Sequence, residues 1–272
     1  MNPILRRQDG KNEIWLSGYV IQNEDKWFYD WLGYDTVCPA DIIDALGQLN
    51  SEPVTVRIDG YGGSVFAGAT IFQQFMDYPG NVDFIITGLS ASILSVIPMA
   101  SVKKGNNCKM SPLAMMMLHN VQGGRDGDYR DMEHEAERLK AANATIRSAY
   151  RMKSGLSDEK IGELMDNETW LDAQGALDLG LIDEILYTDD FTEDTQPPRA
   201  MINALQGRYR AIHNSIIPPS RNSIEQIRAA LHPPNAPPED DPEESHGDND
   251  DINQAKALFA LEEQRYGGIH NA

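Results

Sequence analysis

The chain has few cysteines and a deficit of positive charge. Cys38 and Cys108 are its only cysteines. They are too few and too far apart for a disulfide scaffold or a zinc knuckle, so we expect a reducing compartment. The 23 basic against 42 acidic residues give a formal net charge of −19. Because this charge would repel duplex DNA and anionic membranes, the sequence argues against nucleic acid or a membrane as partner.

No long uninterrupted apolar run is present either. The least charged stretch, residues 85–102, is broken by glycine, serine and proline, whereas a membrane-spanning helix needs about 20 mostly apolar residues. The N-terminus becomes charged before any apolar stretch long enough for a secretion signal. We therefore expect neither a membrane span nor export, and predict a cytoplasmic protein.

The composition changes late in the chain. Residues 189–272 hold 15 acidic against 7 basic side chains and 9 of the 15 prolines. Paired prolines remove backbone donors, so we predict a mostly disordered, acidic, proline-rich tail with short helices at residues 223–231 and 251–266. The predicted organisation is an N-terminal tail at 1–12, a folded domain at 13–188 and this C-terminal tail.

Within the folded domain, short apolar runs alternate with amphipathic segments. Strands are expected at residues 13–22, 54–58, 82–87, 107–110, 114–118 and 182–186. Helices are expected at residues 39–49, 64–76, 91–101 and 128–153, and after the capping residues Ser157 and Asp172. Repeated strand–helix units favour an α/β fold with largely parallel pairing.

Two strand-to-helix turns carry small residues that suit chemistry on a carbonyl group. Gly60, Gly62 and Gly63 precede a helix, and such a turn can present its amides to a phosphate or an oxyanion. It has neither the spacing of a dinucleotide-binding loop nor the lysine of a P-loop. Ser92, in the second turn, lies near free helix amides. The glycine turn alone is equally compatible with a tight turn of no function, whereas the serine turn alone is more often a packing interface of small residues.

His119 is the one histidine of six in a suitable setting. It follows an apolar strand at the edge where α/β sites lie, and an imidazole there can take a proton from a serine. A carboxylate is then needed to hold the imidazole tautomer. Asp166 and Glu168 are the candidates, since Asp172 is better explained as a helix cap, and the residues alone do not choose between them.

Four motifs follow one another in this order: Gly62-Gly63-Ser64-Val65-x-Ala67-Gly68, Gly88-x-x-Ala91-Ser92, Met117-Leu118-His119 and Trp170-Leu171-x-Ala173-x-x-Ala176-x-x-x-Gly180-Leu181-Ile182-Asp183. Together they resemble the proteolytic subunit of Clp protease, ClpP, over residues 13–186. Tyr61, where the family usually has proline, and the tryptophan-rich segment 27–31 are similar to the phage or prophage branch, the ClpP-like prohead proteases.

The resemblance implies a ClpP/crotonase-like ββα spiral with a protruding handle helix. It also implies that Ser92 is the nucleophile and His119 the general base, with the backbone amides of Gly63 and Ile93 as the oxyanion hole. The family's aspartate falls on Glu168, so the resemblance favours this residue as the acid. A glutamate there is a departure, because its extra methylene requires a slightly retracted backbone.

The implied activity is that of an ATP-dependent Clp-type serine endopeptidase, which cleaves peptide bonds through an acyl-enzyme without a metal or organic cofactor. Its substrates would be unfolded proteins or phage head and scaffold proteins in the bacterial host cytoplasm. The resemblance further implies a homo-oligomeric ring, a heptamer alone or in stacked pairs, and an ATPase unfoldase as partner. Two alternatives stay open: a non-catalytic scaffold or assembly protein on the same fold, and a crotonase-type acyl-CoA enzyme.

Overall fold

The computed structural model describes residues 4–8 and 10–187. The acidic tail at 189–272, with its predicted disorder and two short helices, lies outside the described residues. The predicted division of the chain into three parts accordingly stays a prediction. Residues 27–34 belong to a second compact unit, so their helix is described by itself below.

The described residues form one nine-stranded mixed sheet. Its strands are β1 (Leu5–Gln8), β2 (Lys11–Val20), β3 (Thr36–Val37), β4 (Val54–Gly63), β5 (Val82–Ala91), β6 (Asn107–Met110), β7 (Met115–Leu118), β8 (Thr169–Leu171) and β9 (Glu184–Ile185). The main path is β1-β2-β4-β5-β6-β9, with β3 on β2, β7 on β5 and β8 on β7. All pairs are parallel except β1–β2 and β7–β8. The expected α/β fold with largely parallel pairing is confirmed.

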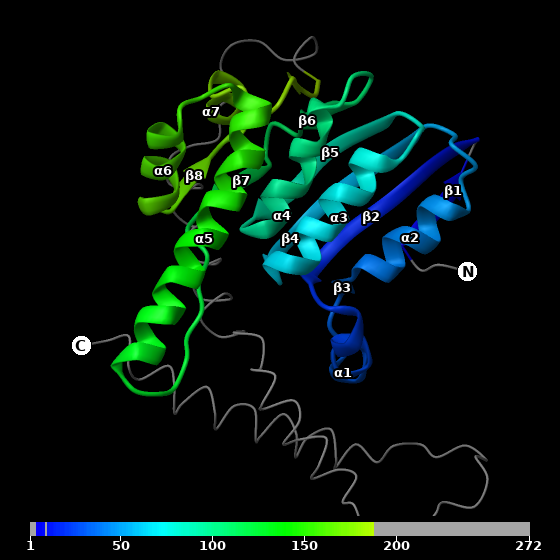
Figure 1. Cartoon of the computed structure of the whole chain (residues 1–272). Coiled ribbons are helices and arrows are strands. Elements are labelled where there is room, and N and C mark those ends of the chain that lie inside the picture. The colour runs from blue at the N-terminus through cyan, green and yellow to red at the C-terminus, as the bar shows by residue number, and fades with distance from the viewer. Residues whose placement is uncertain (1–3, 9, 188–272) are drawn as a thin grey trace, which may run out of the picture. The chain divides into compact units, whose positions relative to one another are not determined.

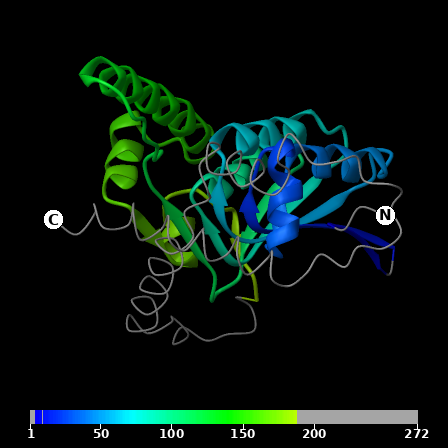
Figure 2. The same cartoon turned by 90° about the horizontal axis from the view of Figure 1, so that it is seen from below.

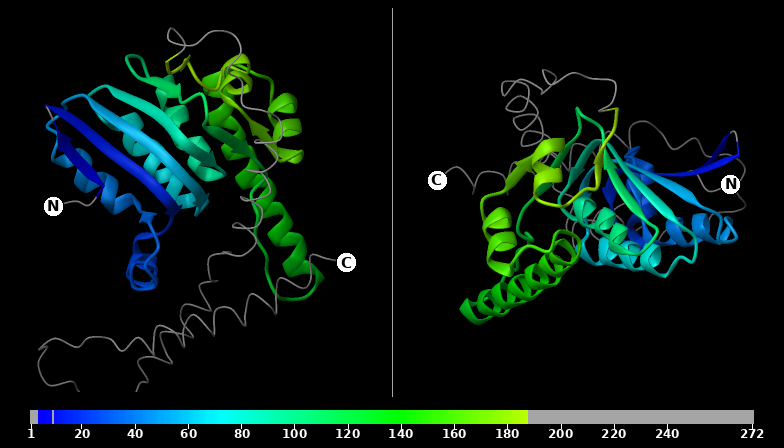
Figure 3. Two further views of the ribbon diagram at one scale, coloured as in Figure 1. Left: turned by 180° about the vertical axis from the view of Figure 1, so that it is seen from behind. Right: turned by 90° about the horizontal axis from the view of Figure 1, so that it is seen from above.

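Helices cover one face of this sheet. The helices of the unit that holds the sheet are the 3₁₀ helix η1 (Asn23–Asp25), α2 (Pro39–Gly47), α3 (Val65–Asp77), α4 (Ile93–Val96), the 3₁₀ helix η2 (Ile97–Val102), α5 (Tyr129–Ser154), α6 (Asp158–Asp166) and α7 (Ala173–Asp178). In Figure 1, α2, α3 and α4 lie in front of the strands, and in the reverse view of Figure 3 they lie behind them. The Phe75 ring of α3 meets the Phe84 ring of β5 edge-on, with centroids 5.3 Å apart. The core therefore lies between α3 and the central strands.

Both predicted helix caps are confirmed. The Ser157 hydroxyl accepts a hydrogen bond from the Lys160 amide at 3.2 Å, and the Asp172 carboxylate accepts one from the Gly175 amide at 2.7 Å. Each cap satisfies a backbone donor that has no partner within its helix. Because Asp172 is committed to this role, it is not free to act as an acid elsewhere.

Two predicted boundaries around Ser92 were wrong. β5 continues to Ala91 instead of stopping at Thr87, and the expected helix at 91–101 is divided into α4 and η2. Pro98 explains the division, because it has no N–H with which to continue the α-helical hydrogen bonds. Ser92 consequently stands alone between a strand and a short helix.

Several elements had not been predicted: β3 and β8 are short strands, η1 (Asn23–Asp25) is a 3₁₀ helix, and two more carry aromatic contacts. Leu5–Gln8, within the expected N-terminal tail, pairs antiparallel with β2 as β1. Its Arg6 guanidinium lies 4.5 Å from the centre of the Trp15 ring, a cation–π contact. The other is α1 (Lys26–Leu32), in which the Phe28 ring contacts the Trp31 ring at a centroid distance of 6.1 Å.

The long helix α5 extends beyond the sheet at its N-terminal end (Figures 1 and 2). Ile146, Ala149 and Tyr150, near its C-terminus, are buried, whereas Tyr129 and Met132 at the start are exposed by 71% and 47%. Apolar burial therefore lies in the later part of this helix, and the elements that α5 packs on are η2, α6 and α4. Exposed apolar side chains at the projecting end are compatible with the predicted handle.

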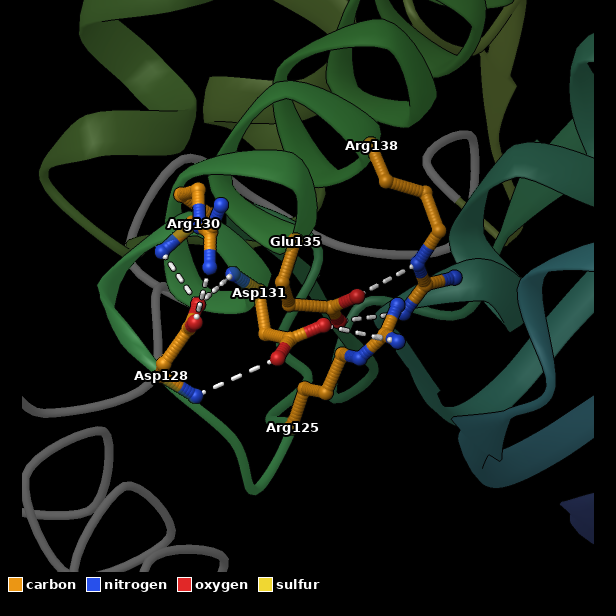
Figure 4. A network of polar contacts seen from close by, with 6 residues as sticks. All are labelled: Arg125, Asp128, Arg130, Asp131, Glu135 and Arg138. Atoms are coloured by element: carbon orange, nitrogen blue, oxygen red, sulfur yellow. Dashed lines mark hydrogen bonds and ion pairs between the residues drawn. The ribbon is translucent and has the colours of Figure 1, made fainter.

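Charged side chains stabilise the projecting end of α5 (Figure 4). They are Arg125, Asp128, Arg130, Asp131, Glu135 and Arg138. The Asp128 carboxylate accepts from the amides of Arg130 and Asp131, which makes it the helix cap. A hydrogen bond from the Arg130 side chain, together with these amides, holds the pKa of Asp128 below its usual value. The projecting end of α5 is thus stabilised by its own ion pairs and cap hydrogen bonds.

The two thiols are expected to react only when the protein unfolds. Cys38 and Cys108 are both buried, and burial raises the pKa of both, that of Cys108 to about 12. The thiolate is the reactive form, so at pH 8 the Cys108 thiol should react with a disulfide reagent about a thousandfold more slowly than an ordinary cysteine. Stopped-flow thiol titration in buffer and in guanidinium measures this. Rapid modification of Cys108 in native buffer would contradict the buried placement.

Candidate active site

Ser92 occupies a strained turn at the carboxyl end of β5. Its φ of 55° and ψ of −134° are rare for a residue with a side chain. The turn is held because the Ser92 amide donates to the Met117 carbonyl at 3.0 Å, linking it to β7. α4 begins at the next residue, Ile93. The Ser92 hydroxyl thus lies at the carboxyl end of a central strand, beside the first amides of a helix.

His119 meets Ser92 because β5 and β7 are parallel neighbours. Ala91 is paired with Met117, so both functional candidates lie just beyond the last paired residues at the same edge of the sheet. The His119 Nε2 atom lies 2.7 Å from the Ser92 Oγ atom. An imidazole nitrogen at this distance can take the hydroxyl proton and make the oxygen nucleophilic.

The glycine turn at the end of β4 packs directly against Ser92. A β-carbon added at Gly62, where φ is +96°, would lie 2.6 Å from the Ser92 Cβ atom. One added at Gly63, where φ is +138°, would lie 2.3 Å from the Val20 carbonyl oxygen. Both positions therefore require glycine. These glycines also let β4 continue to Gly63, well past the predicted end at Ile58.

Ser64, the residue after this turn, holds the start of α3. Its amide donates to the Val20 carbonyl at 2.7 Å, and its hydroxyl accepts from the Ala67 amide at 3.3 Å and from Gln22 Nε2 at 2.9 Å. Sequence reasoning did not single out Gln22, because the contact spans 42 residues and depends on the pairing of β2 with β4. The glycine turn is therefore supported from both sides.

Replacing Gly62 by alanine should lower the free energy of unfolding by about 1–3 kcal/mol, because the new methyl group meets Ser92 and the backbone has a positive φ. Gly47→Ala is the matched control. No atom lies within 4 Å of a β-carbon added at Gly47, at the end of α2, so this variant should be stabilised by about 0.4–1 kcal/mol. Equilibrium denaturation of both variants measures the difference. Equal stability of the two would count against the packing of Gly62 on Ser92.

The two candidate acids lie on either side of the turn between α6 and β8. Asp166, the last residue of α6, accepts a hydrogen bond from Asn120 Nδ2 at 2.7 Å. Glu168 adopts a left-handed φ of 45° and accepts a hydrogen bond from Trp170 Nε1 at 3.2 Å. The two carboxylates thus have different partners, which composition alone could not distinguish.

The pairing of β7 with β8 relates Glu168 to the histidine. In this antiparallel pair Leu118 is opposite Thr169. His119 directly follows the first of these residues and Glu168 directly precedes the second. Directly opposed residues of antiparallel strands have β-carbons about 4.5–5.5 Å apart, within reach of one another's side chains.

In the described part of the chain, His, Cys, Asp and Glu side chains form no group of three or more that could hold a metal ion. Nor does any helix at residues 4–8 or 10–187 have the length and apolar character needed to span a membrane.

The sequence around this site also matches a known protein family. A family model described as Clp protease matches residues 37–189, a span that contains the Ser92–His119 contact and Glu168. The chain belongs to the Clp protease family. Its mixed α/β architecture is the fold of that family, as expected from the four motifs.

Relatives in the Clp protease family come from several bacteria. The ATP-dependent Clp protease proteolytic subunit of Bacteroides fragilis is 32% identical over 135 residues, which are 50% of this chain and 64% of that protein. The subunit 1 of Chlamydia trachomatis is 30% identical over 139 residues, 50% of this chain and 71% of the relative. The Streptococcus agalactiae subunit is 33% identical over 145 residues, 53% and 73% of the two chains. The chain thus spans less than two thirds of the Bacteroides relative.

Proposed function

We propose that this chain is a serine endopeptidase that cleaves peptide bonds through an acyl-enzyme. The observation that carries the proposal is the 2.7 Å contact between Ser92 Oγ and His119 Nε2. Membership of the Clp protease family supports it. The strained backbone of Ser92 adds further support, because such strain is typical of functional residues.

In the proposed mechanism His119 takes the Ser92 proton as the serine oxygen attacks the substrate carbonyl. The amides of Gly63 and Ile93 hold the oxyanion of the tetrahedral intermediate. His119 then protonates the leaving amine, and in the second half-reaction it activates the water that hydrolyses the acyl-enzyme. No metal or organic cofactor takes part in these steps.

Glu168 is proposed as the acid that orients His119. Continuing the register of β7 and β8 by one residue pairs His119 with Glu168, which supports this choice. Asp166 is the alternative, but its carboxylate is engaged by Asn120. A carboxylate beside the imidazole would fix its tautomer and stabilise its protonated form.

We further propose that the chain works as a ring of identical subunits in the bacterial cytoplasm. The names of its relatives describe proteolytic subunits of an ATP-dependent protease, which supports an ATPase unfoldase as partner. The exposed apolar residues Tyr129 and Met132 on the projecting end of α5 suit contacts between rings. Unfolded proteins are the proposed substrates. The resemblance of Tyr61 and segment 27–31 to the phage branch supports phage head and scaffold proteins among these substrates.

A fluorophosphonate probe tests the proposed reaction on the full chain. We expect one probe per subunit, located on Ser92 by peptide mass mapping, and no labelling after denaturation. The His119→Ala variant should label far more slowly, because its serine has no general base. Absence of label on correctly assembled protein would overturn the proposal and favour a scaffold or assembly role on the same fold.

A further inference from the structure

A buried pair of hydroxyl groups lies directly behind Ser92. The Ser95 Oγ atom lies 2.7 Å from the Tyr150 hydroxyl oxygen, 2.6 Å from the Ser92 carbonyl oxygen and 3.1 Å from the Met117 carbonyl oxygen. Ser95 is fully buried and Tyr150 is 1% exposed. Tyr150 comes from α5, 55 residues further along the chain.

The chemistry of the four oxygens fixes the direction of these hydrogen bonds. The two carbonyls can only accept, and the 2.6 Å contact with the Ser92 carbonyl is the shortest that Ser95 Oγ makes, so we assign the single Ser95 hydroxyl proton to the carbonyls. Tyr150 must then donate its own proton to the Ser95 oxygen. Burial raises the pKa of Tyr150 well above its usual value, so the phenol keeps the proton it donates. The chain of donors runs from Tyr150 through Ser95 to the backbone.

These hydrogen bonds end on a peptide group that the proposed reaction uses. The Ser92 carbonyl accepts from the Ser95 hydroxyl and also from the Ser95 amide, at 2.9 Å. It belongs to the same planar peptide unit as the Ile93 N–H. Fixing the carbonyl therefore fixes the direction of that N–H. Hydrogen bonds to the carbonyl also polarise the unit, which makes the N–H a stronger donor.

The second acceptor links the serine turn to the strand that carries the histidine. The Met117 carbonyl accepts from the Ser92 amide at 3.0 Å and from the Ser95 hydroxyl. Met117 lies two residues before His119, on β7. The Ser95 hydroxyl thus links the Ser92–Ile93 peptide group to the same Met117 carbonyl that accepts from the Ser92 amide.

We propose that Ser95 and Tyr150 are positioning residues of the acyl-transfer reaction, which hold the Ser92–Ile93 peptide group so that the Ile93 N–H points at the oxyanion. This inference rests on the proposed function. It adds to that function a residue of α5, whose C-terminal end thereby becomes part of the support of the site.

Tyr150→Phe tests the proposal, because it removes one oxygen atom and leaves the packing of the ring. We expect kcat for a fluorogenic peptide to fall about 10- to 100-fold with KM unchanged. A misdirected oxyanion donor weakens the stabilisation of the transition state but leaves substrate binding as it was. The rate of fluorophosphonate labelling per subunit should fall with kcat. Size-exclusion chromatography checks that assembly is unchanged.

Tyr78→Phe is the matched control. Tyr78 is also a buried residue, and its hydroxyl donates to the Glu52 carbonyl at 2.5 Å in a half-buried hydrogen bond, away from Ser92. Both variants lose one tyrosine hydroxyl and its hydrogen bond and should be destabilised, but Tyr78→Phe should keep the wild-type kcat. A fall in kcat in both variants, or in neither, would overturn the positioning role.

Ser95→Ala completes the design. It should lower kcat at least as much as Tyr150→Phe, and the double variant should be little worse than Ser95→Ala alone, because both residues act through one hydrogen-bond chain. Independent, multiplicative effects would contradict the shared chain. If wild-type Ser92 takes no probe, the proposed function fails. If it does and Tyr150→Phe behaves as wild type, only the positioning inference fails.

Discussion

Ser92→Ala is expected to lower kcat for peptide hydrolysis by about 10⁴-fold or more, the loss typical of a serine protease without its nucleophile. The physical reason is that His119 would have no hydroxyl to activate, although its Nε2 atom would keep its place at the edge of β7. Substrate binding should change little, so the loss falls on kcat. Steady-state hydrolysis of a fluorogenic peptide, with labelling of the same preparation, measures it.

Ser101→Ala is the appropriate control for this loss. Ser101 is buried, whereas Ser92 is half-buried, and the Ser101 hydroxyl oxygen makes no hydrogen bond within the described residues. Its removal should leave kcat unchanged and stability nearly so. Equal activity of Ser92→Ala and wild type would show that any hydrolysis comes from another residue or from a contaminating protease.

Glu168→Gln is expected to have the second largest effect, a fall in kcat of up to about 10⁴-fold. The amide would keep the size of the side chain but could no longer stabilise the protonated imidazole, and it would allow the wrong tautomer. Glu168→Asp should retain much more activity, since it keeps the charge and shortens the side chain by one methylene. Peptide hydrolysis by the three forms at one pH measures the series.

Asp166→Asn is the matched variant that separates the two acids. It also neutralises a carboxylate in the turn between α6 and β8, but one that is hydrogen-bonded to Asn120. We expect its kcat to stay within about threefold of wild type. Surface substitutions usually change free energies by about 0.5 kcal/mol, and such a change in the activation free energy alters a rate about two- to threefold. A large loss in Asp166→Asn with an active Glu168→Gln would transfer the proposed role to Asp166.

Local signals in the sequence predicted much of the fold. Ser157 and Asp172 could be identified as caps because capping depends on residues three positions apart. The setting of His119 could be identified because an apolar strand directly precedes it. The end of β5 could not be predicted, because its last residues are fixed by pairing with β7 and not by their own strand propensity.

The surroundings of the site were less predictable. The contact of Ser95 with Tyr150 requires the later part of α5 to pack behind α4, and neither residue differs locally from an ordinary core serine or tyrosine. The choice between Asp166 and Glu168 depends on the register of β7 with β8, and a shift by one residue would turn the side chains of β8 to the other face. Long-range packing and strand register cannot be predicted from local sequence pattern.

The backbone at Ser92 has a consequence for how this protein can change over generations. A φ of 55° costs a residue with a β-carbon energy that glycine does not incur. Exchange of Ser92 for glycine would therefore relax the turn while removing the hydroxyl. Under the proposed function, the reactive form of this fold is therefore not its most stable form, and a descendant released from selection for hydrolysis could gain stability by losing that one oxygen.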